Sequence, residues 1–150
     1  MPVANAKRFA IQGSLLLAGA QDSPVYSSDS MWVHLKIYAQ GGENDLHAHP
    51  EEEHSFIVLE GRAEFFDEVG ESTVLGPYEG ILLPRGTLYR FRSAGTSNLV
   101  MLRIGCGRNS RLPGQADGRV DPAGVPMHGN PTQIAKGRTT VPSGVKFGAQ

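Results

Sequence analysis

Short runs rich in β-branched and aromatic residues, separated by glycine and proline, dominate the first two thirds of this sequence and limit what it can fold into. No stretch shows a convincing helical periodicity. Many short strands joined by tight turns favour an antiparallel sandwich or small barrel. Because the chain has 150 residues and no internal repeat, we expect one all-β domain with one core. The predicted strands are residues 31–39, 55–59, 63–66, 81–83, 88–92 and 98–104.

Residues 107–150 differ in composition from the rest of the chain. They hold 8 Gly and 5 Pro among 44 positions, and six basic against two acidic side chains, whereas residues 1–106 carry eight basic and thirteen acidic ones. We therefore expect a β-barrel domain at 1–106, which includes N-terminal strands, and a Gly/Pro-rich C-terminal extension at 107–150. The extension is expected to pack on the acidic barrel or on a partner subunit through Val141, Val145 and Phe147; a partly disordered tail is the alternative.

Charge and cysteine content exclude several classes of protein. The 14 Lys and Arg against 15 Asp and Glu give a formal charge of −1, which argues against nucleic acid or a membrane surface as partner. The single Cys106 excludes an intramolecular disulfide and a cysteine zinc knuckle. No apolar run approaches the roughly 20 residues that span a bilayer. We expect a cytoplasmic protein; the alternative is an export signal over residues 7–20, where two basic residues precede an apolar stretch.

Three of the five histidines, His47, His49 and His54, fall within eight residues. On a strand, His47 and His49 would project to the same face, roughly 7 Å apart at their Cα atoms. A turn at residues 50–53 would bring His54 opposite them on the returning strand. Three imidazoles from two strands suit a divalent transition metal better than a hard cation. The alternative is a solvated hairpin, which does not explain three histidines in phase with strand alternation.

The spacing around these histidines resembles the first motif of the cupin family, with Gly41, His47, His49 and Gly61 in register. The position of the family's glutamate ligand falls on His54. The second motif keeps only its centre, Pro84-Arg85-Gly86, and Tyr89 stands where the family has its last histidine. The resemblance covers roughly residues 31–105 and implies an all-β, single-domain cupin-type jelly-roll barrel, also called a double-stranded β-helix. A homodimer that pairs through its outer sheet face is expected.

The resemblance implies a metal-dependent enzyme with His47, His49 and His54 as ligands. Tyr89 is the candidate fourth ligand, acid/base catalyst or structural tyrosine. Fe(II) is favoured as the cofactor, with Zn, Ni, Mn or Cu as alternatives, because cupins with three-histidine iron centres include dioxygenases. We therefore expect a non-haem Fe(II) dioxygenase that acts on a small enolisable or phenolic molecule. The alternatives are a metal-dependent isomerase, cyclase or lyase that uses Tyr89 as acid/base, and a non-catalytic barrel that binds a small ligand.

Four further residues are expected to line the substrate pocket: Phe56, Val58, Phe91 and His34. In the strand at 31–39, polar and aromatic residues alternate with Val33, Leu35 and Ile37, and either face could point into the barrel. Arg103 could reach a substrate carboxylate, although a structural salt bridge is the more frequent role for such a residue. Glu51 to Glu53 are expected to be solvated or to orient the histidines through hydrogen bonds.

Overall fold

The computed structural model describes residues 5–107, 118–127 and 140–148, and within these ranges every regular element is a strand. No helix of this part of the chain is long and apolar enough to cross a membrane. The strands are β1 (Gln12–Ala18), β2 (Ala20–Ser27), β3 (Met31–Tyr38), β4 (Gly42–His47), β5 (Glu52–Glu60), β6 (Ala63–Phe66), β7 (Ser72–Leu75), β8 (Gly80–Leu83), β9 (Tyr89–Ser93), β10 (Leu99–Gly107) and β11 (Val141–Gly148).

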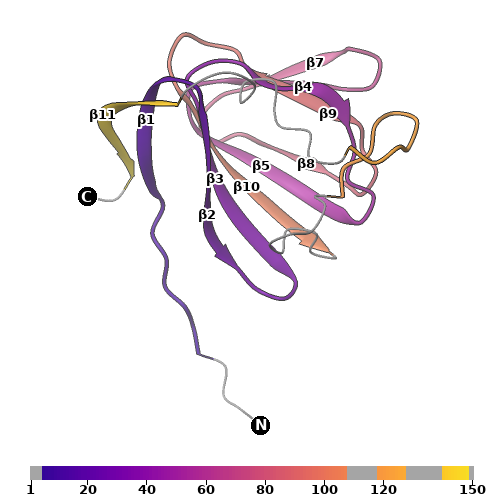
Figure 1. Ribbon diagram of the computed structural model, residues 1–150, viewed down its shortest axis with the longest axis horizontal. Coiled ribbons are helices and arrows are strands. Elements are labelled where there is room, and N and C mark those ends of the chain that lie inside the picture. The colour runs from indigo at the N-terminus through magenta and orange to yellow at the C-terminus, as the bar shows by residue number, and fades with distance from the viewer. Residues whose placement is uncertain (1–4, 108–117, 128–139, 149–150) are drawn as a thin grey trace.

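The strands form two facing antiparallel sheets and one small outer sheet (Figure 1). The five-stranded sheet has the order β2-β3-β10-β5-β8, and the four-stranded sheet has the order β4-β9-β6-β7. Neighbours that lie far apart in sequence, such as β3 and β10, pair over their whole length. The predicted all-β, cupin-type jelly roll is confirmed.

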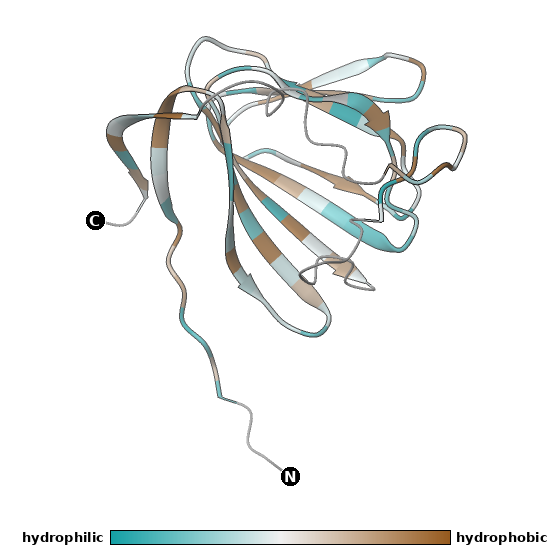
Figure 2. Ribbon diagram, in the orientation of Figure 1, coloured by the Kyte–Doolittle hydropathy of each residue, from teal (hydrophilic) through white to brown (hydrophobic). Residues whose placement is uncertain are grey.

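Along the strands, residues that face the core between the two sheets alternate with residues that face outward. Figure 2 shows hydrophobic and hydrophilic bands alternating along the five-stranded sheet. Phe56 and Val58 of β5 and Phe91 of β9 are each 0% exposed, and they pack together with residues from β3, β6, β8 and β10. Burial of large side chains of this kind contributes roughly 1.5–3 kcal/mol each. This core fixes the distance between the sheets and so the width of the interior.

The polar face of β3 points into the barrel. Trp32 and Lys36 are each 2% exposed on the inner side, whereas Leu35 and Ile37 pack with Leu16 of β1 in a second cluster on the outer side. From the sequence, either face of this strand could have pointed into the barrel. The outer cluster covers apolar positions on the outer face of the five-stranded sheet. We expected two subunits to pair through this face, and the homodimer stays a prediction.

The described parts of the C-terminal extension contact the barrel at two places. Strand β11 pairs with β1, and Phe147 packs on the outer cluster, while Val141 and Val145 are 39% and 57% exposed. Val120 pairs with Ala48, the residue between the first two predicted ligands. In the described residues, the extension thus adds a separate two-stranded sheet with β1 and an isolated bridge at Ala48, and the division at residue 106 stays a prediction.

Candidate metal centre

Strand ends and one connecting segment place the predicted metal-site residues in the barrel interior. His47 is the last residue of β4 and pairs with Tyr89, the first residue of β9. His54 lies on the inner face of β5, in phase with Phe56. His49 lies in the connection between β4 and β5. The four side chains are 1–4% exposed.

Backbone hydrogen bonds on both sides hold the segment that carries His47 and His49. The amide and carbonyl of Ala48 bond to the carbonyl and amide of Val120, each at 3.0 Å. The amide of Gly86 donates to the carbonyl of His49 at 3.0 Å. Gly86 has a φ of 80°, a conformation that favours glycine. The centre of the second motif therefore positions a residue of the first.

The four predicted residues converge. The ring centroids of His49 and His54 lie 3.9 Å apart, those of His47 and His49 5.3 Å, and those of His47 and Tyr89 4.4 Å. The hydroxyl of Tyr89 lies 3.3 Å from Nε2 of His49. Tyr89 is thus within hydrogen-bond distance of a candidate ligand.

In the described residues, a group of potential metal-ligand atoms comes from His49, Glu52 and His54. One atom from each lies within 4.8 Å of the others. Sequence reasoning gave Glu52 at most an orienting role; its signal was the two-residue spacing to His54, which puts both side chains on one face of β5. His47 lies beside this group, and its role as a ligand stays a prediction.

Hydrogen bonds with neighbouring residues orient Glu52 and His47. The indole N–H of Trp32 donates to Oε2 of Glu52 at 3.0 Å, and the same oxygen lies 3.6 Å from Nε2 of His54. Nδ1 of His47 lies 2.7 Å from the carbonyl oxygen of Asp45, so it is the protonated nitrogen when the ring is neutral. Such outer contacts restrict ring rotation and favour one tautomer.

The donor set fits a divalent transition metal. Nδ1 of His49 and Nε2 of His47 are buried and have no hydrogen-bond partner in the part of the chain that the structure describes. Burial lowers the pKa of His49 below its ordinary 6.5, and the charges of His54 and Arg103 act in the same direction; burial likewise lowers the pKa of His47. A neutral imidazole keeps a lone pair for a metal, and this His-Glu-His cluster therefore fits a metal site.

Arg103 reaches into the same cluster from β10. Its Nη2 lies 3.3 Å from Nδ1 of His54 and 3.4 Å from Nε2 of His49. The side chain is 3% exposed. The structural salt bridge expected for Arg103 is absent from the described residues, where none of the recorded ion pairs involves it. The guanidinium faces imidazoles and aromatic rings instead.

A row of charged side chains continues from the cluster along the inner face of β3. Nζ of Lys36 lies 3.0 Å from Oε1 of Glu43 and 3.5 Å from Oδ2 of Asp22, and Oε2 of Glu43 lies 3.4 Å from Nε2 of His47. Burial opposes ionisation of Glu43, yet Lys36 holds the pKa of that carboxyl well below its ordinary range. His34, predicted in the pocket, lies on this face with Nδ1 2.7 Å from Oδ1 of Asp22. The row therefore brings the Glu43 carboxylate next to His47 without a hydrogen bond to its ring.

The other predicted pocket residues lie deeper in the core. Phe56 and Phe91 have ring centroids 5.5 Å apart, and Phe56 lies 5.9 Å from the ring of Tyr89. Val58 belongs to the same cluster. These side chains form an apolar support next to Tyr89; whether substrate touches them stays a prediction.

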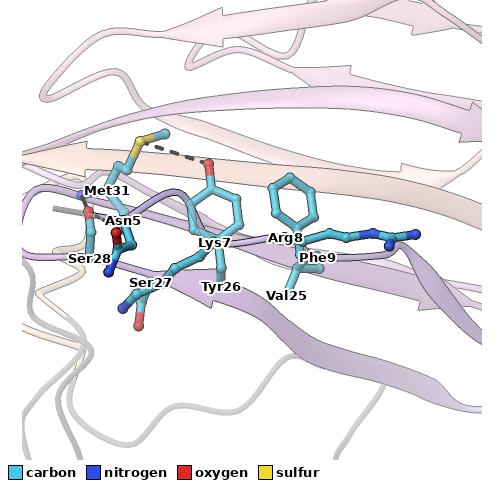
Figure 3. A pocket seen from close by; sticks show the side chains of 9 residues that line it. All are labelled: Asn5, Lys7, Arg8, Phe9, Val25, Tyr26, Ser27, Ser28 and Met31. Carbon is cyan, nitrogen blue, oxygen red and sulfur yellow. Dashed lines mark hydrogen bonds between the residues drawn. The ribbon is translucent and has the colours of Figure 1, made fainter.

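A separate surface cavity of about 470 Å³ lies between the N-terminal arm and β2 (Figure 3). Figure 3 shows Phe9 beside Tyr26, whose rings lie 4.7 Å apart, with the Tyr26 hydroxyl directed at the Met31 sulfur. None of the residues that line this cavity belongs to the histidine cluster. The cavity therefore supplies nothing to the candidate metal centre.

Comparison with known proteins identifies a domain in the central part of the chain. Residues 34–105 match the model of the cupin domain. The uncharacterised protein YdbB of Bacillus subtilis strain 168 is 42% identical over 61 residues, which cover 41% of this chain and 52% of that protein. The chain thus matches about half the length of this relative.

Solved structures support the same assignment through the fold. A protein with a double-stranded β-helix domain from Klebsiella pneumoniae has a TM-score of 0.58 at 18% identity, over 69% of this chain and 80% of that one. Recombinant oxalate oxidase in complex with glycolate has a TM-score of 0.54 at 18% identity, over 70% of this chain and 56% of that one. Matches at this identity establish the fold alone. With the domain match, the sheet topology and the histidine spacing in agreement, residues 34–105 of this chain form a cupin domain.

Proposed function

We propose that this cupin is a metal-dependent enzyme, a non-haem Fe(II) dioxygenase acting on a small, enolisable or phenolic anion. His49, Glu52 and His54 would hold the metal, with His47 as a further ligand. Fe(II) in such a site supplies electrons for reaction with dioxygen and a Lewis acid for an enolate or phenolate oxygen. The remaining side chains bind, orient and exchange protons with the substrate.

The observation that carries the proposal is the His-Glu-His cluster. Two histidines and one carboxylate on one side of an ion are typical of non-haem Fe(II) oxygenases, because they leave positions open for substrate and dioxygen. The cluster is buried, and the Trp32 ring packs against His54 with ring centroids 5.2 Å apart. A dry site strengthens each electrostatic contact made inside it.

Charge favours an anionic substrate. Glu52 neutralises one of the two charges of a divalent ion, and the Arg103 guanidinium adds a further positive charge next to His49 and His54. Two unit charges at about 4 Å interact by about 4 kcal/mol at an effective dielectric constant near 20. An anion beside this cluster therefore gains a large electrostatic stabilisation, whereas a neutral analogue does not.

Tyr89 is the proposed proton carrier. Its hydroxyl lies 3.3 Å from Nε2 of His49. Because His49 is a proposed metal ligand, this hydroxyl would lie close to a substrate bound at the metal. General acid–base catalysis by a positioned side chain contributes typically about 10²–10⁴-fold in rate. The same geometry would serve a metal-dependent isomerase, cyclase or lyase, in which dioxygen takes no part.

Oxygen consumption tests the proposal. Protein reconstituted with Fe(II) under anaerobic conditions is mixed with acetylacetone or catechol, and dioxygen uptake and product are measured. We expect uptake of one dioxygen per substrate consumed. His49→Ala and Glu52→Gln should abolish it, and Arg92→Met, a change on the outer face of β9, should not.

The other outcomes identify the alternatives. Turnover of the substrate at the same rate without dioxygen would replace the dioxygenase by an isomerase, cyclase or lyase. Saturable substrate binding without turnover would indicate a non-catalytic ligand-binding cupin. Uptake that persists in His49→Ala would show that the cluster is not the reacting centre.

A further inference from the structure

Arg103 is a buried cation whose guanidinium is in direct contact with no carboxylate of the described residues. Its side chain is 3% exposed, and no carboxylate oxygen of the described residues is recorded within 4.0 Å of its guanidinium. Its Nε also has no hydrogen-bond partner among them. Lys36, the other cation on the inner face, is paired with Glu43 at 3.0 Å. The charges of Glu43 and Asp22 act on Arg103 from beyond contact distance, so an anion that is not part of the chain would supply a direct counter-charge.

The guanidinium is aimed into the candidate metal centre. Nη2 lies within 3.4 Å of ring nitrogens of His49 and His54. Trp32 and Phe56 flank its carbon, with ring centroids at 5.1 and 5.9 Å, and these rings limit where the group can move. An anion that contacts Arg103 would therefore lie next to the histidines.

We propose that Arg103 binds the anionic oxygen or carboxylate of the substrate and so selects acids over neutral analogues. A guanidinium presents a rigid fork of donors that matches a carboxylate, and the pair is strong in a site that excludes water. This inference rests on the proposed function in naming the same site, but the anion contact itself needs no metal. It follows that the metal-free protein should already bind a small carboxylate.

Glycolate and its neutral amide, glycolamide, test this with metal-free protein. Trp32 is the one tryptophan of the sequence and its ring lies beside the guanidinium, so its fluorescence reports binding, with calorimetry as a second readout. We expect saturable binding of glycolate at least ten times tighter than that of glycolamide. Arg103→Met should lose this preference, and Arg92→Met should keep it.

Equal affinity for glycolate and glycolamide in the unaltered protein, or an unchanged preference in Arg103→Met, would overturn the proposal. If Arg103→Met does not fold, as judged by thermal unfolding, Arg103→Lys replaces it. That variant keeps the charge and loses the fork, so glycolate should bind several-fold more weakly; equal binding would again overturn the proposal.

A metal titration separates this inference from the proposed function. Glycolate binding through Arg103 in a protein that binds no Fe(II) or Zn(II) would leave the inference standing and refute the metal-dependent enzyme. Metal binding at the histidines without a preference for glycolate would refute the role of Arg103 and leave the metal-dependent enzyme standing. We expect both to bind, and glycolate to tighten metal binding in the unaltered protein more than in Arg103→Met.

Discussion

The buried pair of Lys36 and Glu43 gives a prediction that can be worked out from the geometry. The two side chains are 2% and 6% exposed, with Nζ and Oε1 3.0 Å apart. Lys36→Met removes the cation and leaves a carboxylate in the core, a change that typically costs about 3–5 kcal/mol of the free energy of unfolding. Burial raises the pKa of Glu43 and the charge of Lys36 lowers it, so this pKa should rise in the variant. The effect should reach His47, whose Nε2 lies 3.4 Å from the same carboxylate.

Urea unfolding of metal-free protein at pH 7.5 measures this cost in a double-mutant cycle. Lys36→Met and Glu43→Leu should each destabilise strongly, and the double variant should lose much less than the sum, because apolar side chains then replace both charges. Arg92→Met, which breaks an exposed ion pair with Glu64, is the control and should stay close to the unaltered protein. Additive single effects, or a Lys36→Met variant as stable as the control, would refute the reasoning.

Three further outcomes are expected. Because the folded-state pKa of His47 and of His49 lies below the ordinary 6.5, the unfolded chain alone takes up these protons as the pH falls. The metal-free protein should therefore lose stability below about pH 6.5, by at most about 1.4 kcal/mol per pH unit per histidine, measured by urea unfolding at pH 7.5, 6.5 and 5.5. Gly105→Ala should destabilise by about 1–3 kcal/mol in thermal unfolding, since its methyl group would overlap the Trp32 ring. Tyr89→Phe should keep its metal and lose about 10²–10⁴-fold in turnover, measured by oxygen uptake and elemental analysis.

A different result would contradict each of these expectations. Stability that is flat between pH 7.5 and 5.5 would mean that the buried histidines take up protons in the folded state. Gly95→Ala, where nothing lies closer to the new methyl than 3.9 Å, is the control for Gly105→Ala, and equal stability of the two variants would contradict the packing argument. Metal loss in Tyr89→Phe equal to that in His49→Ala would make the phenol a ligand.

Strands whose residues alternate clearly could be predicted from sequence, and those held mainly by their neighbours could not. All six predicted strands overlap β3, β5, β6, β8, β9 and β10. Strand β4 contains Asn44 and Asp45, residues that are unusual in strands, and exists because it pairs with β9. Strand β11 contains Pro142 and Gly144 and pairs with the edge of β1.

The convergence of the histidines was predicted from strand alternation, which holds for His54 on β5 but not for His49, because β4 ends at His47. Backbone hydrogen bonds of Ala48 and of the His49 carbonyl position His49 instead. The partners of those histidines could not be predicted, because they come from other strands. Glu52 is adjacent in sequence to solvated glutamates, and its burial depends on the Trp32 indole 20 positions away. The contact of Arg103 with His49 joins residues 54 positions apart. The sequence does not show that charged residues of β3, β4 and β10 meet inside the barrel, because this depends on how the three strands assemble.

Metal stoichiometry tests the central claim most directly. Protein freed of metal is titrated with Fe(II) or Zn(II), and bound metal per chain is determined by elemental analysis and calorimetry for the unaltered protein, His49→Ala and Glu52→Gln. We predict one tightly bound ion per chain in the unaltered protein and a loss of at least 100-fold in affinity in His49→Ala, which corresponds to about 2.7 kcal/mol. Absence of tight binding in the unaltered protein, or the same affinity in all three, would contradict a metal centre at His49, Glu52 and His54.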